Sequence, residues 1–456
     1  MTLLNSQKTS TIYFNETSEH RFTLFNIRSL GMIHPRHRNP NLLCYLFQNK
    51  TGFINYPVSL HGSICFSNTT CMFKILVLTD FASSYSRLML EGMIRYSREV
   101  GPWTFIRMPL YYMMINGETG VIDFAKKWHA DAIIAQLRDV NIELLRELNI
   151  PIIVQNYHKR NSYISNLTGD YYGTGVMAAD FYLEKGYQHF AFYGYENVIW
   201  SRERGLGFKE RIEKKGLTCH LLENNNRGDT NEWIYNTEII AQWLQSLPKP
   251  VALFACDDYY AQQIAETCNI FNISVPDDIA ILGVDNDLLI CNLSTPPLSS
   301  ITLDVENGGY QTAKLLDRYI KKEIGEIPDI VINPLYIEER ASTDKYAVTD
   351  PHIKILMDYI YQNYNNKISV PDLVDMVPLS RRVLEKKFKN LVGTSIYQYI
   401  LNFRISRFTK LLLTTDLYLP DIAIQVGFDD YKNVSRIFRK YKSMSPAEYR
   451  KLHKKQ

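Results

Sequence analysis

The sequence predicts a two-lobe α/β domain, with parallel sheets flanked by helices, followed by an all-α domain that contains two helix-turn-helix motifs. Short apolar runs alternate with helical stretches between residues 72 and 343, and two helix-turn-helix patterns lie near the C-terminus. Positive charge is concentrated in the same C-terminal segment. Residues 351–456 contain 19 Lys and Arg against 9 Asp and Glu, a net charge of +10, so the first 350 residues carry −7 of the total of +3. A basic domain of this kind indicates a phosphate-bearing partner.

Residues 1–71 follow neither pattern. They contain only two acidic residues, Glu16 and Glu19, and no sustained periodicity, while Met72 stands immediately before the first predicted strand. We expect residues 1–71 to be a disordered extension, or to lie upstream of a true start at Met72. The alternative is a small folded arm built on four apolar residues, Phe47, Phe53, Ile54 and Val58.

The segment from residue 72 to residue 343 alternates predicted strands and helices. Apolar runs typical of buried strands occupy residues 74–79, 132–135, 151–154, 189–193, 251–254 and 279–282. Residues 85–99 carry apolar side chains at helical spacing. This alternation favours parallel sheets wrapped in helices, in which ligands bind beyond the carboxyl ends of the strands.

Acidic residues stand at several of these predicted strand ends. Asp80 follows the first strand, Asp257 and Asp258 follow residues 251–256, and Asp285 follows residues 279–284. Adjacent carboxylates such as Asp257 and Asp258 usually point in different directions, which argues against an acid/base pair for sugar hydrolysis. The sequence also lacks a Gly-x-Ser-x-Gly elbow, a P-loop and a His-Glu-x-x-His motif. We therefore predict a binding protein and not an enzyme.

The first helix-turn-helix pattern spans residues 368–391. Pro378 ends one helix, and Ser380 is the expected N-cap of the next. In that second helix we expect the apolar side chains, Val383 included, to form a buried stripe. The opposite face then presents five charged residues, Arg381, Arg382, Glu385, Lys386 and Lys389.

The second pattern spans residues 419–441. A short apolar helix is followed by Gly427, which accepts the turn, and by Asp430 as N-cap of the next helix. That helix should bury Val434, Phe438 and Tyr441. Its exposed face carries residue types that reach bases and phosphates in a major groove, namely Lys432, Asn433, Arg436, Arg439 and Lys440. Residues 395–413 predict a connector helix that could hold the two recognition helices about one DNA turn, roughly 34 Å, apart.

Several short motifs in this segment have a familiar order and spacing. They are Gly393-Thr394-Ser395, Arg404 with Leu411-Leu412, Ile422-Ala423 with Gly427-Phe428, Phe438-Arg439-Lys440, and Ser445-Pro446 with Tyr449-Arg450. Over about a hundred residues the segment resembles the DNA-binding domain of AraC-type transcriptional regulators. The resemblance implies double-stranded promoter or operator DNA as the partner. It also implies that one set of side chains on each recognition helix faces the DNA, namely Arg381, Arg382, Glu385 and Lys386 on the first and Tyr431, Lys432, Asn433 and Arg436 on the second. For each of these residues, base readout, phosphate contact and plain solvent exposure all stay open.

The preceding segment carries a second set of motifs. They are Gly169-Asp170-Tyr171, Lys185-Gly186, Arg202-Glu203-Arg204, Cys256-Asp257-Asp258, Gly283-Val284-Asp285-Asn286 and Pro296-Pro297-Leu298. They resemble the periplasmic-binding-protein-like sensor of LacI-type regulators. A LacI-type sensor fused to an AraC-type domain is similar to the xylose operon regulatory protein family, as is the linker around residues 340–351. The implied domains are a sensor over 72–343, a linker over 344–351 and a DNA-binding domain over 352–456.

The resemblance implies that a free sugar, D-xylose above all, enters a cleft between two sensor lobes. The implied ligand shell is Arg204, Asp257 and Asp285, with Asp80, Asp170 and Asp258 as further candidates and Trp200 or Tyr85 as stacking partners. Other readings stay open at this point. Asp170 and Asp258 could cap the helices that follow them, Arg204 could be an exposed helix charge, and Trp200 could be a core residue.

The same resemblance implies a transcription regulator that acts as a homodimer in the cytoplasm, associated with the nucleoid, and that contacts RNA polymerase if it is an activator. A different sugar, a sugar phosphate or a non-sugar ligand is the alternative effector. The seven cysteines are scattered without C-x-x-C spacing, so we expect no zinc site, no other metal site and no cofactor. No run of eighteen apolar residues and no signal-peptide pattern are present, which favours a reducing cytoplasm and no membrane partner.

Overall fold

The structure is a computed structural model that describes residues 72–108, 110–137, 145–223, 236–348 and 350–454, together with three strands nearer the N-terminus. The chain forms two compact units, Met1–Phe73 and Lys74–Gln456. The first contains an antiparallel sheet of β1 (Leu24–Asn26), β2 (Leu42–Asn49) and β3 (Gly52–Ser59), in that order. Most of residues 1–71 lie outside the described part of the chain, so our interpretation of this segment stays a prediction.

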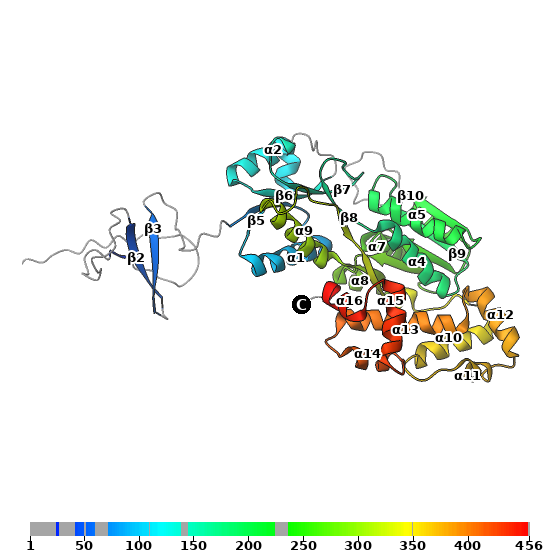
Figure 1. The fold of residues 1–456 in the computed structure, drawn as a ribbon. Helices are drawn as coiled ribbons and strands as arrows, with labels where there is room; N and C mark the ends of the chain where they lie inside the picture. Colours follow the sequence, from blue (N-terminus) through cyan, green and yellow to red (C-terminus); the bar gives the residue numbers. More distant parts are fainter. Residues whose placement is uncertain are drawn as a thin grey trace, which may run out of the picture. The chain divides into compact units, whose positions relative to one another are not determined.

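The first lobe of the second unit is a six-stranded sheet in the order β14-β8-β7-β6-β4-β5 (Figure 1). Every recorded strand pair in it is parallel. Its strands are β4 (Lys74–Leu78), β5 (Thr104–Arg107), β6 (Ala132–Leu137), β7 (Ile152–Asn156), β8 (Ser165–Gly169) and β14 (Ile330–Ile332). Its helices are α1 (Ser84–Val100), α2 (Leu110–Trp128) and α9 (Val305–Ile320). An apolar core that includes Leu76, Val121 and Ile133 lies between α2 and the sheet.

The second lobe repeats this design with the strand order β10-β9-β11-β12-β13-β15. Its strands are β9 (His189–Gly194), β10 (Cys219–Glu223), β11 (Val251–Ala255), β12 (Ile279–Val284), β13 (Ser299–Leu303) and β15 (Pro334–Glu338), and only β15 is recorded as antiparallel to its neighbour. Its helices are α4 (Tyr171–Glu184), α5 (Ile199–Glu213), α6 (Thr237–Ser246), α7 (Asp258–Ile270) and α8 (Leu288–Leu293). The predicted two-lobe α/β fold is confirmed.

One strand that the sequence did not reveal, β8, has a polar buried face. In β8 the side chains of Ser165, Asn166 and Thr168 are all buried. Their hydrogen bonds compensate for burial, because the Ser165 hydroxyl donates to the Pro328 carbonyl at 2.9 Å and Asn166 Nδ2 donates to Asp329 Oδ1 at 2.9 Å. A search for apolar runs misses a strand of this kind.

Helices pack against each other through glycine in both lobes. A Cβ on Gly309 of α9 would lie 2.0 Å from the backbone oxygen of Met89 in α1. In the second lobe, a Cβ on Gly175 of α4 would lie 2.0 Å from the backbone oxygen of Arg204 in α5. The backbones of these helix pairs therefore touch, and any side chain at these positions would separate them.

The C-terminal domain consists of seven helices, coloured yellow to red in Figure 1. They are α10 (Pro351–Asn363), α11 (Val370–Val374), α12 (Arg381–Val392), α13 (Ile396–Thr414), α14 (Leu419–Gln425), α15 (Tyr431–Lys442) and α16 (Pro446–His453). One apolar core lies under α10, α11 and α12, and another under α14, α15 and α16, with α13 contributing to both. The tandem helix-turn-helix prediction and its connector helix are confirmed.

Two details of that prediction are wrong. Val383 is 49% exposed and Tyr441 is 44% exposed, although both were expected to be buried. In α12 the buried positions are Leu384, Phe388 and Val392, which form a narrower stripe than expected. Tyr441 lies at the edge of the core, where its hydroxyl donates to Asn402 Oδ1 of α13 at 2.7 Å, so a polar contact takes the place of the expected apolar packing.

The predicted linker is packed against the sensor over the residues that the structure describes. The Ala347 backbone N–H donates to the Lys185 carbonyl at 3.0 Å. Val348 is buried, belongs to the core under α10, and lies against Gly186, where a Cβ would come within 2.3 Å of its Cγ2. The DNA-binding domain is therefore not tethered by a loose segment.

We predict that Gly309→Ala lowers the melting temperature, because the new methyl group must push α9 away from α1. Overpacking of this kind costs about 1–3 kcal/mol. The matched control is Gly325→Ala, since a Cβ at Gly325 would meet nothing within 4 Å. Thermal unfolding measured by circular dichroism compares the two variants, and equal melting temperatures would contradict the predicted tight contact.

Candidate functional site

A buried guanidinium lies at the carboxyl ends of the strands in the second lobe. Arg204 of α5 is only 3% exposed, so it is not the surface charge that the sequence left open. Its Nη1 donates to the Cys256 carbonyl at 2.6 Å, and its Nη2 lies 3.7 Å from Asp285 Oδ1. The guanidinium carbon lies 5.5 Å from the ring centre of Tyr171. Its buried Nε has no hydrogen-bond partner among the described residues, which is rare for a buried donor and indicates a missing acceptor.

Two carboxylates accompany Arg204. Asp285 follows β12 with a φ of 101°, a conformation that its backbone N–H stabilises by donating to the Ile301 carbonyl at 3.0 Å. Asp257 is the N-cap of α7 and accepts from the Tyr260 N–H at 3.0 Å. Burial and the neighbouring Asp285 raise the pKa of Asp257 to about 7, while Arg204 lowers it. Burial also raises the pKa of Asp285, and Arg204 opposes this effect.

The third acid of the predicted group has a structural position. Asp258 is 2% exposed, and its Oδ2 accepts from the Asp287 N–H at 2.7 Å. A Cβ on Gly283 would lie 2.2 Å from Asp258 Oδ1, so the carboxylate packs directly on β12. Asp258 therefore holds the loop that carries Asp285, while the cap of α7 is its neighbour Asp257. Asp170 caps α4 by accepting from the Gly173 N–H at 2.8 Å.

The first lobe contributes a tyrosine and an amide to the same region. Tyr85 of α1 hydrogen-bonds Gln155 at the end of β7. Burial raises the pKa of Tyr85 well above its usual value, and Tyr171 and Asp285 raise it further. Gln136 Nε2 donates to Gln155 Oε1 at 2.8 Å and so orients that amide. Tyr171, Gln136 and Gln155 were not among the predicted site residues, because amides and aromatic residues near strand ends carry no spacing signal.

Two further predicted residues, Asp80 and Trp200, make contacts with other groups of the protein. Asp80 is exposed, and its carboxylate accepts from the Ala82 N–H at 2.9 Å. Trp200 packs edge-on against Tyr157 of the first lobe, with ring centres 4.7 Å apart. Trp200 thus lies at a contact between the lobes, where the Ile199 N–H donates to the Tyr157 carbonyl at 2.7 Å. A further contact is the two-pronged ion pair of Arg160 with Glu203, at 2.5 and 2.8 Å.

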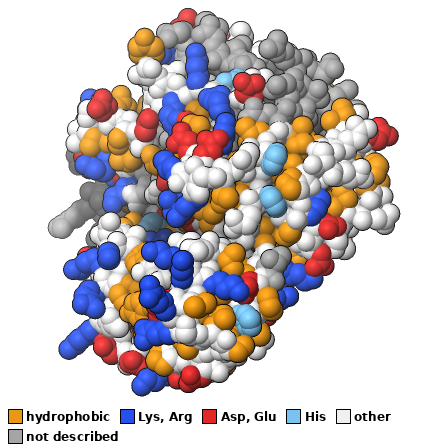
Figure 2. Space-filling view, turned by 90° about the vertical axis from the view of Figure 1, so that its right-hand side faces the viewer, with side chains coloured by type: hydrophobic (Ala, Val, Ile, Leu, Met, Phe, Trp, Pro, Cys, Tyr) orange, Lys and Arg blue, Asp and Glu red, His pale blue; other side chains and the backbone are white. Residues whose placement is uncertain are grey.

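The two helices predicted to face DNA present basic side chains to solvent. On α12, Arg381, Arg382 and Lys386 are exposed, and they line a shallow concave surface together with Glu385, Lys389 and Ser395. Glu385 forms an ion pair with Arg381 at 3.0 Å. Figure 2 shows Lys and Arg side chains gathered on the lower half of the view, over the C-terminal helices.

On α15, Asp430 is the N-cap and accepts from the backbone N–H groups of Lys432 and Asn433. The side chains of Lys432, Asn433 and Arg436 are exposed, whereas Tyr431 is half-buried against the apolar core. The turn before α15 depends on Gly427, whose φ is 86°. A Cβ there would lie 2.2 Å from the Tyr364 carbonyl, which accepts from Arg404 Nε at 2.8 Å.

The part of the chain that the structure describes holds no group of three or more His, Cys, Asp or Glu side chains placed to bind a metal ion. Among its helices, none has the length and apolar character needed to cross a membrane. Cys219, Cys256, Cys268 and Cys291 are buried free thiols. Burial raises the pKa of the Cys256 thiol beside the Arg204 cluster well above its usual value, which disfavours the reactive thiolate form.

Comparison with known proteins agrees with this architecture. The profile of the periplasmic binding protein-like domain matches residues 179–343, and that of a helix-turn-helix domain matches residues 373–452. The xylose operon regulatory protein of Escherichia coli (strain K12) is 31% identical over 389 residues, which cover 83% of this chain and 97% of that protein. The protein of the same name from Haemophilus influenzae is 30% identical over 387 residues, 83% of this chain and 98% of that protein. A solved structure of the xylose-binding transcription activator xylR has a TM-score of 0.52 and 28% identity, covering 85% of this chain and 100% of that one.

Proposed function

Since the chain belongs to the family of xylose operon regulatory proteins, we propose that it is a transcription regulator whose sensor binds D-xylose and whose C-terminal domain binds promoter DNA. The relatives are operon regulatory proteins, and we propose that this chain is likewise a regulator and not an enzyme. The observation that carries the sugar assignment is the Arg204 cluster, in which a buried cation with an unpartnered Nε lies beside Asp257 and Asp285.

The chemistry of this cluster suits a neutral sugar. A pentose hydroxyl both donates and accepts hydrogen bonds, so it pairs with a carboxylate on one side and a guanidinium on the other. Tyr85 and Tyr171 add aromatic surface for the C–H face of the ring. A sugar phosphate fits poorly, because Asp257 and Asp285 already accompany the single cation Arg204 and would repel a further anion.

The DNA-binding assignment rests on the exposed faces of α12 and α15. Arg and Lys recognise guanine and phosphate, Asn recognises adenine, and Glu accepts from cytosine. We propose that Arg381, Arg382, Glu385 and Lys386 on α12, and Tyr431, Lys432, Asn433 and Arg436 on α15, form the DNA contacts. We further propose a cytoplasmic homodimer that binds paired half-sites and that contacts RNA polymerase where it activates transcription.

Sugar binding would act by shifting a population that exists in the free protein. The sugar stabilises the arrangement in which the lobes close on it, and this arrangement favours DNA binding. If closure favours the DNA-competent form about a hundredfold, linkage requires DNA to tighten sugar binding by the same factor, about 2.7 kcal/mol.

We predict that D-xylose stabilises the protein against thermal unfolding in a panel of millimolar pentoses and hexoses. A sugar present at about 100 times its dissociation constant adds roughly 2.7 kcal/mol to the sensor. The variant Arg204→Met should lose this shift, because it removes the donors and keeps the volume. The control is Lys209→Met, an exposed residue of the same helix. A shift with another sugar alone, or with none, would overturn the assignment to xylose.

We predict that sugar affinity falls as the pH decreases through 7. In the sugar-free protein the pKa of Asp257 is raised to about 7, mainly by burial. Donation from a sugar hydroxyl stabilises the ionised carboxylate and lowers its pKa in the complex, so binding is strongest where Asp257 is already ionised. The affinity should drop by up to about tenfold from pH 8 to pH 6, measured by titration calorimetry. Asp257→Asn should flatten the profile, and an unchanged slope would assign the effect to another group.

We predict that Arg436→Ala weakens binding to operator DNA by about 1–3 kcal/mol and relaxes sequence preference at one base pair, as expected for base readout. Gel-shift titration against single-base operator variants measures both effects. Lys354→Ala is the control, because Lys354 is exposed on α10, outside both helix-turn-helix motifs. A uniform loss across all sequences, with a salt slope reduced by about 1, would instead identify Arg436 as a phosphate contact.

A further inference from the structure

The sensor and the DNA-binding domain meet where β15 and the C-terminal end of α4 face α13. Glu339 forms ion pairs with Lys185 of the sensor at 3.1 Å and with Arg407 of α13 at 3.1 Å. Glu338 pairs with Lys410 of α13 at 2.8 Å. These contacts hold α13 against the sensor, and they involve no residue of either recognition helix.

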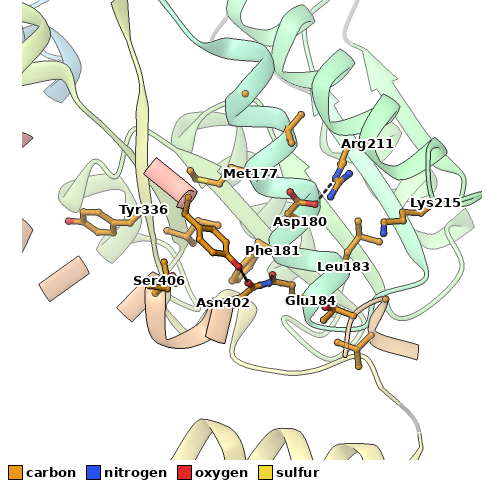
Figure 3. Close-up of a pocket in the computed structure, with 18 of the residues that line it drawn as sticks. Met177, Asp180, Phe181, Leu183, Glu184, Arg211, Lys215, Tyr336, Asn402 and Ser406 are labelled. Atoms are coloured by element: carbon orange, nitrogen blue, oxygen red, sulfur yellow. Dashed lines mark hydrogen bonds and ion pairs between the residues drawn. The ribbon is translucent and has the colours of Figure 1, made fainter. Parts of the chain in front are cut away.

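Beside these ion pairs lies a groove of about 710 Å³ between α4 and the DNA-binding domain (Figure 3). Glu184, the last residue of α4, and Asn402 of α13 point toward each other in it. Asn402 Nδ2 donates to Glu184 Oε1 at 2.8 Å. Burial raises the pKa of Glu184 to about 7, and the bond from Asn402 lowers it, while Asp180 and Glu339 raise it. The amide of Asn402 is therefore an important partner for a carboxylate that has lost much of its water.

Asn402 also continues the contact to α15. Its Oδ1 accepts from the Tyr441 hydroxyl at 2.7 Å and from Gln398 Nε2 at 2.8 Å. An amide can donate from its nitrogen and accept at its oxygen at the same time, so both sets of bonds coexist. Tyr441 lies in the last turn of α15, three residues after the buried Phe438. A continuous chain of hydrogen bonds thus joins the sensor to the second recognition helix.

The other end of α4 lies at the Arg204 cluster. Tyr171, its first residue, is buried under the guanidinium of Arg204 and also lies 5.8 Å from the guanidinium carbon of Arg160. A helix of 14 residues is about 21 Å long, so α4 connects Tyr171 at the Arg204 cluster with Glu184 at the domain contact.

We propose that Glu184, Asn402 and Tyr441 form a relay that transmits the state of the sugar site, through α4, to the recognition helix α15. The inference rests on the proposed sugar-binding function. Asn402 and Tyr441 are positioning residues, since they set the C-terminal end of α15 and are not among the proposed DNA contacts. When a sugar displaces Tyr171, the hydrogen bond from Asn402 to Glu184 becomes stronger or weaker. Asn402 then shifts, and α15 shifts with it through the hydrogen bond of the Tyr441 hydroxyl.

The first test uses the full-length protein without any sugar. Glu184→Ala removes the acceptor of Asn402, so backbone amides around residues 439–443 should exchange hydrogen for deuterium faster. The matched control is Lys410→Met, which also breaks a contact between the domains but does not touch Asn402. Faster exchange in Glu184→Ala alone supports the relay. Equal exchange in both variants, or no change in either, would show that the relay does not hold α15.

The second test measures coupling to the sugar. The factor by which saturating D-xylose tightens operator binding is determined for the native protein, Tyr441→Phe and Tyr397→Phe. Tyr441→Phe removes only the hydroxyl, which donates to Asn402 Oδ1 and accepts from Gln398 Nε2. We expect this factor to fall about fivefold, which corresponds to about 1 kcal/mol. Sugar affinity itself should stay within twofold. Tyr397 is a 65% exposed tyrosine of α13, and its variant should behave like the native protein.

The double variant Glu184→Ala/Tyr441→Phe separates a relay from two independent contacts. In a serial relay the double variant loses no more coupling than the more severe single variant, whereas independent contacts add. Additive losses, or a native response in Tyr441→Phe, would overturn the relay. A native protein that responds to no sugar would instead overturn the proposed function together with the sugar part of this inference, and the exchange measurement would still decide whether the relay holds α15.

Discussion

Arg204 is the charge around which the sensor is organised. A buried cation is tolerated only where acceptors and opposite charge surround it, and here the Cys256 carbonyl and Asp285 provide both. Its position also requires the glycine contacts between α4 and α5, since a Cβ on Gly175 would collide with the backbone oxygen of Arg204. The same cation lowers the pKa values of Asp257 and Asp285, which burial alone would raise further. Close packing of α4 on α5 thus helps to place the buried charge, and this charge in turn lowers the pKa values of the two carboxylates.

Much of the architecture could be predicted from the sequence, because its signals are local. Apolar strands such as β6 and β11, the N-cap positions Ser380 and Asp430, and the turn at Gly427 each occupy the expected place. The strands with polar buried faces, such as β8, could not be found this way. Their hydrogen-bond partners come from residues more than 150 positions away in the sequence.

The candidate site was likewise only partly predictable from the sequence. Arg204, Asp257 and Asp285 were identified through motifs, and the structure brings them together. Tyr171 and Gln155 were missed, because their importance depends on how the two lobes meet and not on any spacing along the chain. Asp80 was predicted as a site residue because it follows a strand, yet its carboxylate accepts a hydrogen bond from the nearby Ala82 N–H. Strand-end position locates a region, and it does not determine where a side chain points.

The edge strand β15 has a consequence for the boundary between the domains. It completes the sensor sheet by pairing with β13, and its Leu335 is buried in the apolar core of α13, α14, α15 and α16. One side chain of the sensor therefore belongs to the interior of the DNA-binding domain. Separating the two domains at the linker would remove Leu335 from that core. The core would then contain a cavity, and the edge of the sensor sheet would expose apolar surface. The two halves of this regulator are separable in sequence but share a folded interior, so neither can be exchanged as an independent module.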